Sequence, residues 1–356
     1  MLEISDEPDR LPNAPHPRET LALVGHEARE HAFLGALASG RMHHAWLLGG
    51  PEGIGKASFA YRAARFVLAA GEPASRARLA ESLAMPEDDP ATRRIMARSH
   101  PDLHVLRRVP KSDGKGYSTN IPVDAVRRII DRFSGSAAEG GWRVAIVDSA
   151  DDMERPAANA LLKLLEEPPP RALFLIVAHA PGRLLPTIRS RCRLLSFEAL
   201  DEAGVATAGR IALERMGGPA DREAVTRVAR FAEGSVRRAL IYADPETLAL
   251  VEAVRARLDA LPGIDLSALL ALAEDVAGRQ GDRDFAVMIE TVQGWLSAHL
   301  HAHAQASAAR LAPLAEVWEK LQRAARDVEA YNLDRRPLVL SMFHDLSDAV
   351  ARSRAA

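Results

Sequence analysis

The sequence predicts an α/β domain with a parallel sheet, followed by a small helical domain and a larger all-α domain. In the first 200 residues, short apolar runs alternate with amphipathic stretches, as in parallel strands covered by helices. After Phe197 no strand-like run follows, and helical periodicity continues to the end. A chain of 356 residues with 47% hydrophobic content is large enough for two or three cores. We expect the domains to cover residues 1–197, 198–245 and 246–356.

The apolar runs of the first domain predict short, buried parallel strands, because they are rich in leucine and β-branched residues. They lie at residues 45–48, 103–106, 143–147 and 173–177. Helices are expected at 56–70 and 156–166. Two further stretches, 71–100 and 110–120, contain prolines or glycines and polar residues, which predicts insertions outside the core.

The remaining sequence predicts helices at residues 202–216, 221–232, 236–243, 246–258, 266–280, 285–302, 314–331 and 337–351. In the last of them, Leu340, Phe343, Leu346, Ala349 and Val350 recur at spacings typical of one apolar helix face. The C-terminal third is therefore expected to be a helical bundle.

The composition excludes several classes of protein. The chain has 46 basic and 48 acidic residues, so no global field attracts it to nucleic acid, and any DNA contact must be local. A single cysteine excludes an intrachain disulfide. The first residues do not combine a basic start with an apolar stretch, and no apolar run approaches the ~18–20 residues of a spanning helix. We expect a cytoplasmic protein without a membrane partner.

Residues 50–57 (GPEGIGKA) match a phosphate-binding loop, and they lie between a predicted strand and a predicted helix, as that motif requires. Gly50, Gly53 and Gly55 allow backbone N–H groups to surround a phosphate, and Lys56 is placed to reach the outer phosphates. The next position normally carries a hydroxyl that coordinates Mg²⁺, but Ala57 has none. Ser58 lies about 100° further around the helix.

Asp148 ends the apolar strand at 143–147, where a P-loop site places its second acidic residue. ATPases of this type follow it with a glutamate that orients the attacking water, and this chain has Ser149 there. Asp151 and Asp152 either replace that carboxylate or cap the next helix, and we favour capping. Both losses predict a degenerate nucleotide site that requires no cofactor, does not hydrolyse ATP and at most holds ATP or ADP inertly.

Several segments resemble the clamp-loader branch of the AAA+ proteins, and within it the family of bacterial delta-prime subunits. The matching segments are residues 43–48 (HHAWLL), 159–169 (NALLKLLEEPP), the motif Ser190, Arg191 and Cys192, residues 234–240 (GSVRRAL) and, more weakly, 332–336 (NLDRR). Together they span about residues 20–340. The resemblance implies that the three domains are an AAA+ P-loop domain, a helical lid and an α-helical collar for oligomerisation.

The resemblance also implies partners and roles. Clamp loaders of this type are heteropentamers of delta, delta-prime and three tau/gamma subunits, which load a sliding clamp onto primed DNA. Delta-prime does not hydrolyse ATP, and its S-R-C arginine, here Arg191, reaches the ATP of the adjoining tau/gamma subunit. Arg237 corresponds to the sensor 2 arginine of a nucleotide site. The alternative for Arg191 is an ordinary surface arginine paired with a carboxylate.

The chain departs from the family pattern in two places. Many members carry four zinc-binding cysteines after the phosphate-loop helix, whereas residues 69–100 contain none, so no zinc is expected. Histidine ligands are a weak alternative, with His43, His44, His100 and His104 as the candidates. At the sensor 1 position, related ATPases place Thr or Asn, and this chain has Ala178 and His179. Cys192 is interpreted as a packing residue because no His/Asp partner pattern accompanies it.

Three alternatives compete with this interpretation. The first is an ATP-hydrolysing motor subunit of the tau/gamma type, which Ala57 and Ser149 disfavour. The second is an autonomous P-loop kinase or regulator, which needs neither the S-R-C motif nor a helical collar. The third is a DNA-binding module, which the near-neutral charge does not support, although Lys163 remains a candidate DNA contact.

Overall fold

The computed structural model describes residues 7–355 except 9, 12–13, 112–115, 216–221, 279–280, 304–306 and 332. Some predicted segments extend outside this set, at Met216, Asp221, Gln280, Asn332 and part of the loop at 110–120. The chain divides into two compact units, Met1–Leu240 and Ile241–Ala356, which are described separately. Among the described residues, no helix has the length and apolar character needed to cross a membrane.

The first unit contains a five-stranded parallel sheet, which confirms the predicted fold class. Its strands are β1 (Ala45–Gly49), β2 (Leu103–Leu106), β3 (Arg143–Val147), β4 (Ala172–Ala178) and β5 (Arg193–Ser196), in the order β2-β3-β4-β1-β5. The first four match the predicted runs within one residue at each end. The fifth was not predicted, because it is a short edge strand with only Leu195 buried.

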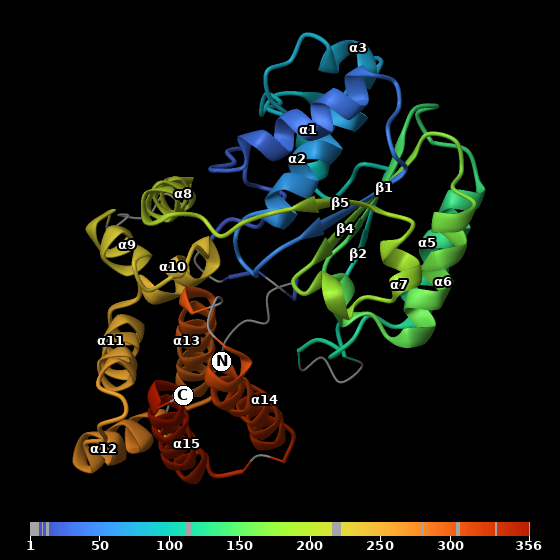
Figure 1. Ribbon diagram of the computed structural model, residues 1–356. Coiled ribbons are helices and arrows are strands. Elements are labelled where there is room, and N and C mark those ends of the chain that lie inside the picture. Colours follow the sequence, from blue (N-terminus) through green and yellow to red (C-terminus); the bar gives the residue numbers. More distant parts are fainter. Residues whose placement is uncertain are drawn as a thin grey trace. The chain divides into compact units, whose positions relative to one another are not determined.

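Helices cover both faces of this sheet (Figure 1). On one face, Trp46, Leu48 and Ile146 pack with helices α1 (Glu27–Ala38) and α2 (Lys56–Leu68). On the other, Leu47, Ala145 and Phe174 pack with α5 (Val123–Ser134) and α6 (Arg155–Glu166). Successive strand residues face opposite sides, so burial of both faces makes the central strands apolar throughout.

The stretch at 71–100 contributes to the core, so its prediction as an insertion outside the core was wrong. It forms α3 (Pro73–Ala77) and α4 (Pro90–Met96), and Leu83 and Ile95 are almost fully buried in the cluster around α1 and α2. Arg76 donates hydrogen bonds to the carbonyls of Phe66, Ala69 and Ala70 at the end of α2. The few apolar residues of this stretch are too widely spaced to form a periodic pattern, so their burial could not be predicted from the sequence.

The remaining elements of the first unit are short helices and a helical segment near its end. They are η1 (Ala150–Asp152), η2 (Pro181–Arg183), α7 (Pro186–Arg189), α8 (Glu202–Arg215), α9 (Arg222–Ala229) and α10 (Val236–Tyr242), which contains the boundary between the two units.

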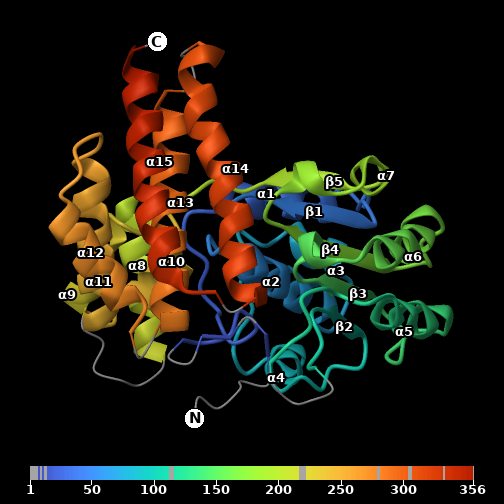
Figure 2. The same ribbon diagram turned by 90° about the horizontal axis from the view of Figure 1, so that it is seen from below.

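Every secondary-structure element in the described part of the second unit is a helix, as the periodicity predicts. Its helices are α11 (Pro245–Asp259), α12 (Leu266–Val276), α13 (Gly281–Ala302), α14 (Ala308–Tyr331) and α15 (Arg335–Ala355). Figure 2 shows α13, α14 and α15 running alongside one another. On α15, Phe343, Leu346, Ala349 and Val350 are buried in the core, which confirms the predicted apolar face.

Candidate functional site: a phosphate loop and a separate arginine

The phosphate loop connects the end of β1 to the start of α2, and its glycines permit its path. Gly50, Gly53 and Gly55 have φ angles of 150°, 76° and 105°, a region that disfavours other residues. A Cβ atom at Gly50 would lie 2.2 Å from the carbonyl oxygen of Phe197, and one at Gly53 would lie 2.1 Å from Ser235 Oγ. The loop is therefore closely packed against two other segments of the unit.

Lys56 is the first residue of α2, and only 2% of its surface is exposed. Its Nζ donates a hydrogen bond to the Gly50 carbonyl at 2.7 Å and another to the Pro51 carbonyl. Burial lowers the pKa of Lys56 to about 8, against the attraction of nearby carboxylates. The Lys56 ammonium group therefore lies at the phosphate loop, as the motif predicts, and it donates hydrogen bonds to carbonyls of the loop itself.

Asp148 follows β3 and lines the same cavity as Lys56 and Ala57. The next residue, Ser149, is buried, and its Oγ donates to Asp151 Oδ2 at 3.0 Å. Ser149 therefore offers no carboxylate to orient a water molecule, and its hydroxyl proton is already donated to Asp151.

Asp151 connects the loop that follows β3 to the loop that follows β4, and it does not cap a helix. Its carboxylate accepts hydrogen bonds from the backbone N–H groups of His179, at 2.5 Å, and Ala180, at 2.9 Å. Helix α6 begins after Glu154 without a side-chain cap, so the capping interpretation was wrong for both Asp151 and Asp152. Asp152 lines the cavity, and its Oδ2 lies 3.5 Å from Arg108 Nε. The link made by Asp151 could not be predicted from a local pattern, because 28 residues separate Asp151 from His179.

A cavity of about 360 Å³ opens beside the phosphate loop. Its charged lining includes Lys56, Asp148 and Arg237, and Arg237 Nε lies 3.6 Å from Glu52 Oε1. The backbone N–H of Arg237 also donates to the Gly53 carbonyl at 3.3 Å, which ties the start of α10 to the loop. The structure thus brings together the predicted residues Gly53, Gly55, Lys56, Asp148 and Arg237, with Gly50 in the same loop.

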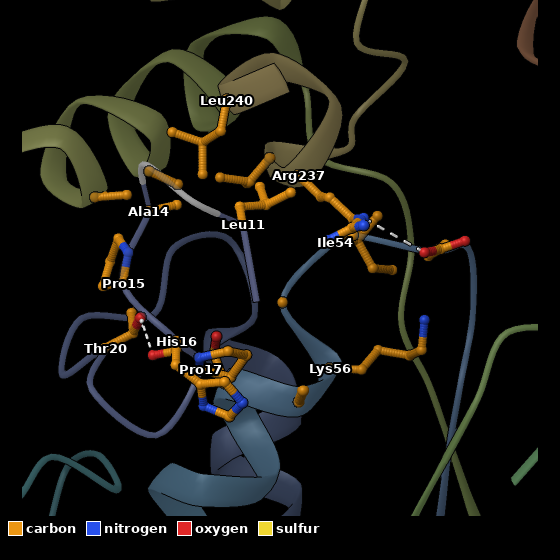
Figure 3. A pocket seen from close by; sticks show the side chains of 18 of the residues that line it. Leu11, Ala14, Pro15, His16, Pro17, Thr20, Ile54, Lys56, Arg237 and Leu240 are labelled. Atoms are coloured by element: carbon orange, nitrogen blue, oxygen red, sulfur yellow. Dashed lines mark hydrogen bonds and ion pairs between the residues drawn. The ribbon is translucent and has the colours of Figure 1, made fainter. Parts of the chain in front are cut away.

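The rest of the cavity wall was not identified from the sequence. Figure 3 shows Leu11, Ala14 and Leu240 together at one end of the cavity, with Lys56 at the other. The described residues of the N-terminal segment 10–24 form much of this wall, although no motif marks them. An apolar end and a cationic end suit a ligand with a flat ring and a phosphate group.

The S-R-C motif lies elsewhere in the unit, because none of its three residues lines the cavity. Arg191 Nη2 pairs with Glu166 Oε1 at 2.7 Å, and Arg191 Nη1 donates to the Thr187 carbonyl at 3.0 Å. The exposed fraction of the Arg191 side chain is 36%. Ser190 is exposed, and its Oγ donates to the Thr187 carbonyl at 3.1 Å.

Cys192 packs against the cluster beneath α5 and α6. Burial raises the pKa of its thiol to about 12, which leaves very little nucleophilic thiolate at neutral pH. The packing interpretation of this residue agrees with its surroundings.

The candidate histidine ligands take part in contacts within the chain. His43 and His44 stack with ring centroids 4.5 Å apart, and His44 Nε2 donates to the Leu165 carbonyl at 3.0 Å. His100 Nδ1 accepts from the Asp102 N–H at 3.2 Å, and the His104 ring packs edge-on against Phe133. Within the described part of the chain, no three His, Cys, Asp or Glu residues are grouped to hold a metal ion.

Comparison with known proteins gives relatives that are named as subunits of DNA polymerase III. Residues 25–201 match the family model described as "DNA polymerase III, delta subunit". The chain is 35% identical over 160 residues to "DNA polymerase III subunit delta'" of Yersinia pestis, covering 45% of this chain and 43% of the relative. It is 40% identical over 149 residues to the delta' subunit of Pseudomonas aeruginosa, covering 42% and 41%. It thus spans about two fifths of the length of these relatives.

Other matches are more distant in sequence. The tau subunit of DNA polymerase III from Escherichia coli is 29% identical over 279 residues, covering 77% of this chain and 40% of that subunit. Among solved structures, a gamma subunit-related protein of Thermotoga maritima matches at 18% identity with a TM-score of 0.39, covering 90% of this chain and 100% of that chain. The matches at residues 25–201, together with relatives named delta', show that the chain belongs to the DNA polymerase III delta subunit family.

Proposed function

We propose that this chain is the delta-prime subunit of a bacterial DNA polymerase III clamp loader and that it does not hydrolyse ATP itself. In this role it joins tau/gamma and delta subunits in a heteropentamer, which loads a sliding clamp onto primed DNA. The lid and collar assigned to residues 198–245 and 246–356 would serve this assembly. The delta' relatives support the proposal, and the partners and DNA follow from the family.

The observation that carries the proposal is an intact phosphate loop without the groups needed for hydrolysis. Ala57 has no oxygen for Mg²⁺, and Ser149 stands where an ATPase carries its water-orienting glutamate. The Ser149 hydroxyl is already bonded to Asp151, which in turn holds the backbone of residues 179 and 180. The Ser149 hydroxyl and the Asp151 carboxylate are therefore both engaged in contacts within the chain.

The cavity supports a second, smaller proposal, that the chain retains ATP or ADP as an inert ligand. Lys56 and Arg237 supply positive charge near the loop, and the opposite end is apolar. A phosphate bound there would compete with the Gly50 and Pro51 carbonyls for Lys56. Such binding would be structural. The proposed role also requires no zinc, because residues 69–100 contain no cysteine.

The proposed role for Arg191 lies outside this cavity. Its guanidinium is partly exposed and belongs to a segment fixed by buried neighbours, so it is accessible to an adjoining subunit. An arginine beside a γ-phosphate neutralises the charge that develops during transfer, and such fingers contribute about 10³–10⁵ in rate. We assign Arg191 this role toward the ATP of a tau/gamma neighbour.

The alternative is a tau/gamma-type motor subunit, because tau relatives match a larger share of this chain, although at lower identity. ATP turnover by the purified chain separates the two. We expect turnover at background for both the wild type and Lys56→Ala, because two catalytic groups are missing. Turnover that Lys56→Ala abolishes would identify a motor subunit and contradict the proposal.

Assembly is the second part of the test. The chain should elute in one complex with tau/gamma and delta subunits when the three are produced together. Failure to join that complex, with the isolated chain correctly folded, would remove the proposed role even if the chain were inactive toward ATP.

A further inference from the structure

Arg191 is held at two points of its guanidinium. Nη2 lies 2.7 Å from Glu166 Oε1, and Nη1 lies 3.0 Å from the Thr187 carbonyl oxygen. A guanidinium has five N–H donors in one plane, so these contacts leave donors for a third group. Both charged side chains remain partly exposed, at 36% for Arg191 and 48% for Glu166. The pair orients the plane of the guanidinium without enclosing it.

The backbones that carry this pair are anchored in the core. On the side of α6, the neighbouring Leu165 is buried, and its carbonyl accepts a hydrogen bond from His44 Nε2 at 3.0 Å. On the other side, Ile188 is fully buried, and its carbonyl accepts from the Arg191 N–H at 3.1 Å. The two side chains therefore meet because the fold sets their attachment points.

The position of Glu166 is unfavourable for α6 itself. It is the last residue of the helix, where the partial negative charge of the helix end repels a carboxylate, and Glu167 adds a second one. A sequence that breaks a local rule of this kind often does so at a functional site. Arg191 supplies the positive charge that offsets the repulsion.

We propose that Glu166 is a positioning residue for Arg191, which it holds in the orientation that reaches a nucleotide bound by the adjoining subunit. The inference rests on the proposed function of Arg191. Without Glu166, the long arginine side chain would spread over more rotamers, and fewer of them would present its planar face to two phosphate oxygens. An exposed ion pair is weak, so a phosphate can engage the remaining donors without first breaking a strong contact.

The test uses the reconstituted complex and four variants of this chain: Glu166→Ala, Arg191→Ala, the double variant, and Glu167→Ala as a matched control. Glu167 is the next residue and is exposed, and the described residues give its carboxylate no ion pair. Glu166→Ala should lower the Arg191-dependent part of ATP turnover about two- to fivefold, because the interaction free energy of an exposed ion pair corresponds to a factor of that size. The effect should appear in kcat, with little change in the KM for ATP, and Glu166→Gln should restore part of it.

The double variant separates positioning from a structural role. In the Arg191→Ala background, Glu166→Ala should have no further effect, because its target is gone. An equal effect of Glu166→Ala in both backgrounds would overturn the inference. So would equal ATPase rates for Glu166→Ala and Glu167→Ala while Arg191→Ala is slow. Either result would leave the proposed function intact. Wild-type turnover in Arg191→Ala would instead contradict the proposed role of Arg191.

Discussion

At the scale of single residues, Glu7 of the first unit has a carboxyl group whose pKa is far below its ordinary value. Only 2% of its surface is exposed, and its carboxylate accepts hydrogen bonds from Arg18 and Arg107. Burial alone would raise its pKa, but these hydrogen bonds outweigh burial and hold the pKa at about 2. Glu7 thereby links the N-terminal segment to the end of β2.

This shift predicts how stability depends on pH. The unfolded carboxylate takes up a proton near pH 4.5, whereas the native one stays ionised to about pH 2. The stabilisation is therefore complete above about pH 5 and is lost as the pH falls through that interval. Glu7→Gln should lower the free energy of unfolding by about 3 kcal/mol at pH 7. Urea denaturation should show this deficit shrinking between pH 5 and 3.

The exposed carboxylate of Glu167 provides the comparison, because Glu167→Gln should change stability by less than about 0.5 kcal/mol at every pH. A deficit for Glu7→Gln that stays constant from pH 7 to pH 3 would show that the loss comes from packing and not from the ionised carboxylate.

At the scale of elements, the stretch at 71–100 shows how a segment without cysteines is held in place. Leu83 is fully buried in the core cluster that includes residues of α1 and α2, while Leu79 of the same stretch is 90% exposed. Leu83→Ala should lower the free energy of unfolding by about 2–4 kcal/mol, and Leu79→Ala by less than about 0.5 kcal/mol. Equal losses from the two variants in urea denaturation would contradict the placement of this segment in the core.

Sequence patterns predicted the elements unevenly, and the reasons are physical. The three inner strands, β1, β3 and β4, were predictable because burial on both faces makes them continuously apolar. The edge strand β2 was predictable from its short apolar run, although three of its four residues are only half-buried. Strand β5 was not, because three of its four residues are exposed. The contribution of 71–100 to the core depends on isolated side chains such as Leu83, which only the tertiary structure brings into the cluster around α1 and α2.

At the scale of the whole molecule, motifs predicted which residues of the site lie together but not which other residues hold them in position. Lys56, Asp148 and Arg237 were named from three separate segments, and all three line one cavity. Two other motifs contained Glu166 and Arg191 without indicating their ion pair, which joins residues 25 positions apart. Contacts of this range follow from chain topology, so a single sequence does not reveal them.

In the proposed role, this protein contributes Arg191 to ATP hydrolysis at a neighbouring subunit and hydrolyses no ATP itself. The most direct test of this role is the ATPase rate of reconstituted complexes with wild type, Arg191→Ala or Arg191→Lys. Assembly should be nearly unchanged, because truncating a partly exposed side chain usually alters stability by no more than about 0.5 kcal/mol. Turnover at the adjoining site should fall at least about tenfold in Arg191→Ala.

Arg191→Lys should recover little of this turnover, because an ammonium keeps the charge but lacks the planar fork that spans two phosphate oxygens. We therefore expect fast ATP turnover with the wild type and slow turnover with both variants, in complexes of equal composition. Equal ATPase and clamp-loading rates in all three complexes would contradict the proposed role and would leave Arg191 as an ordinary surface residue paired with Glu166.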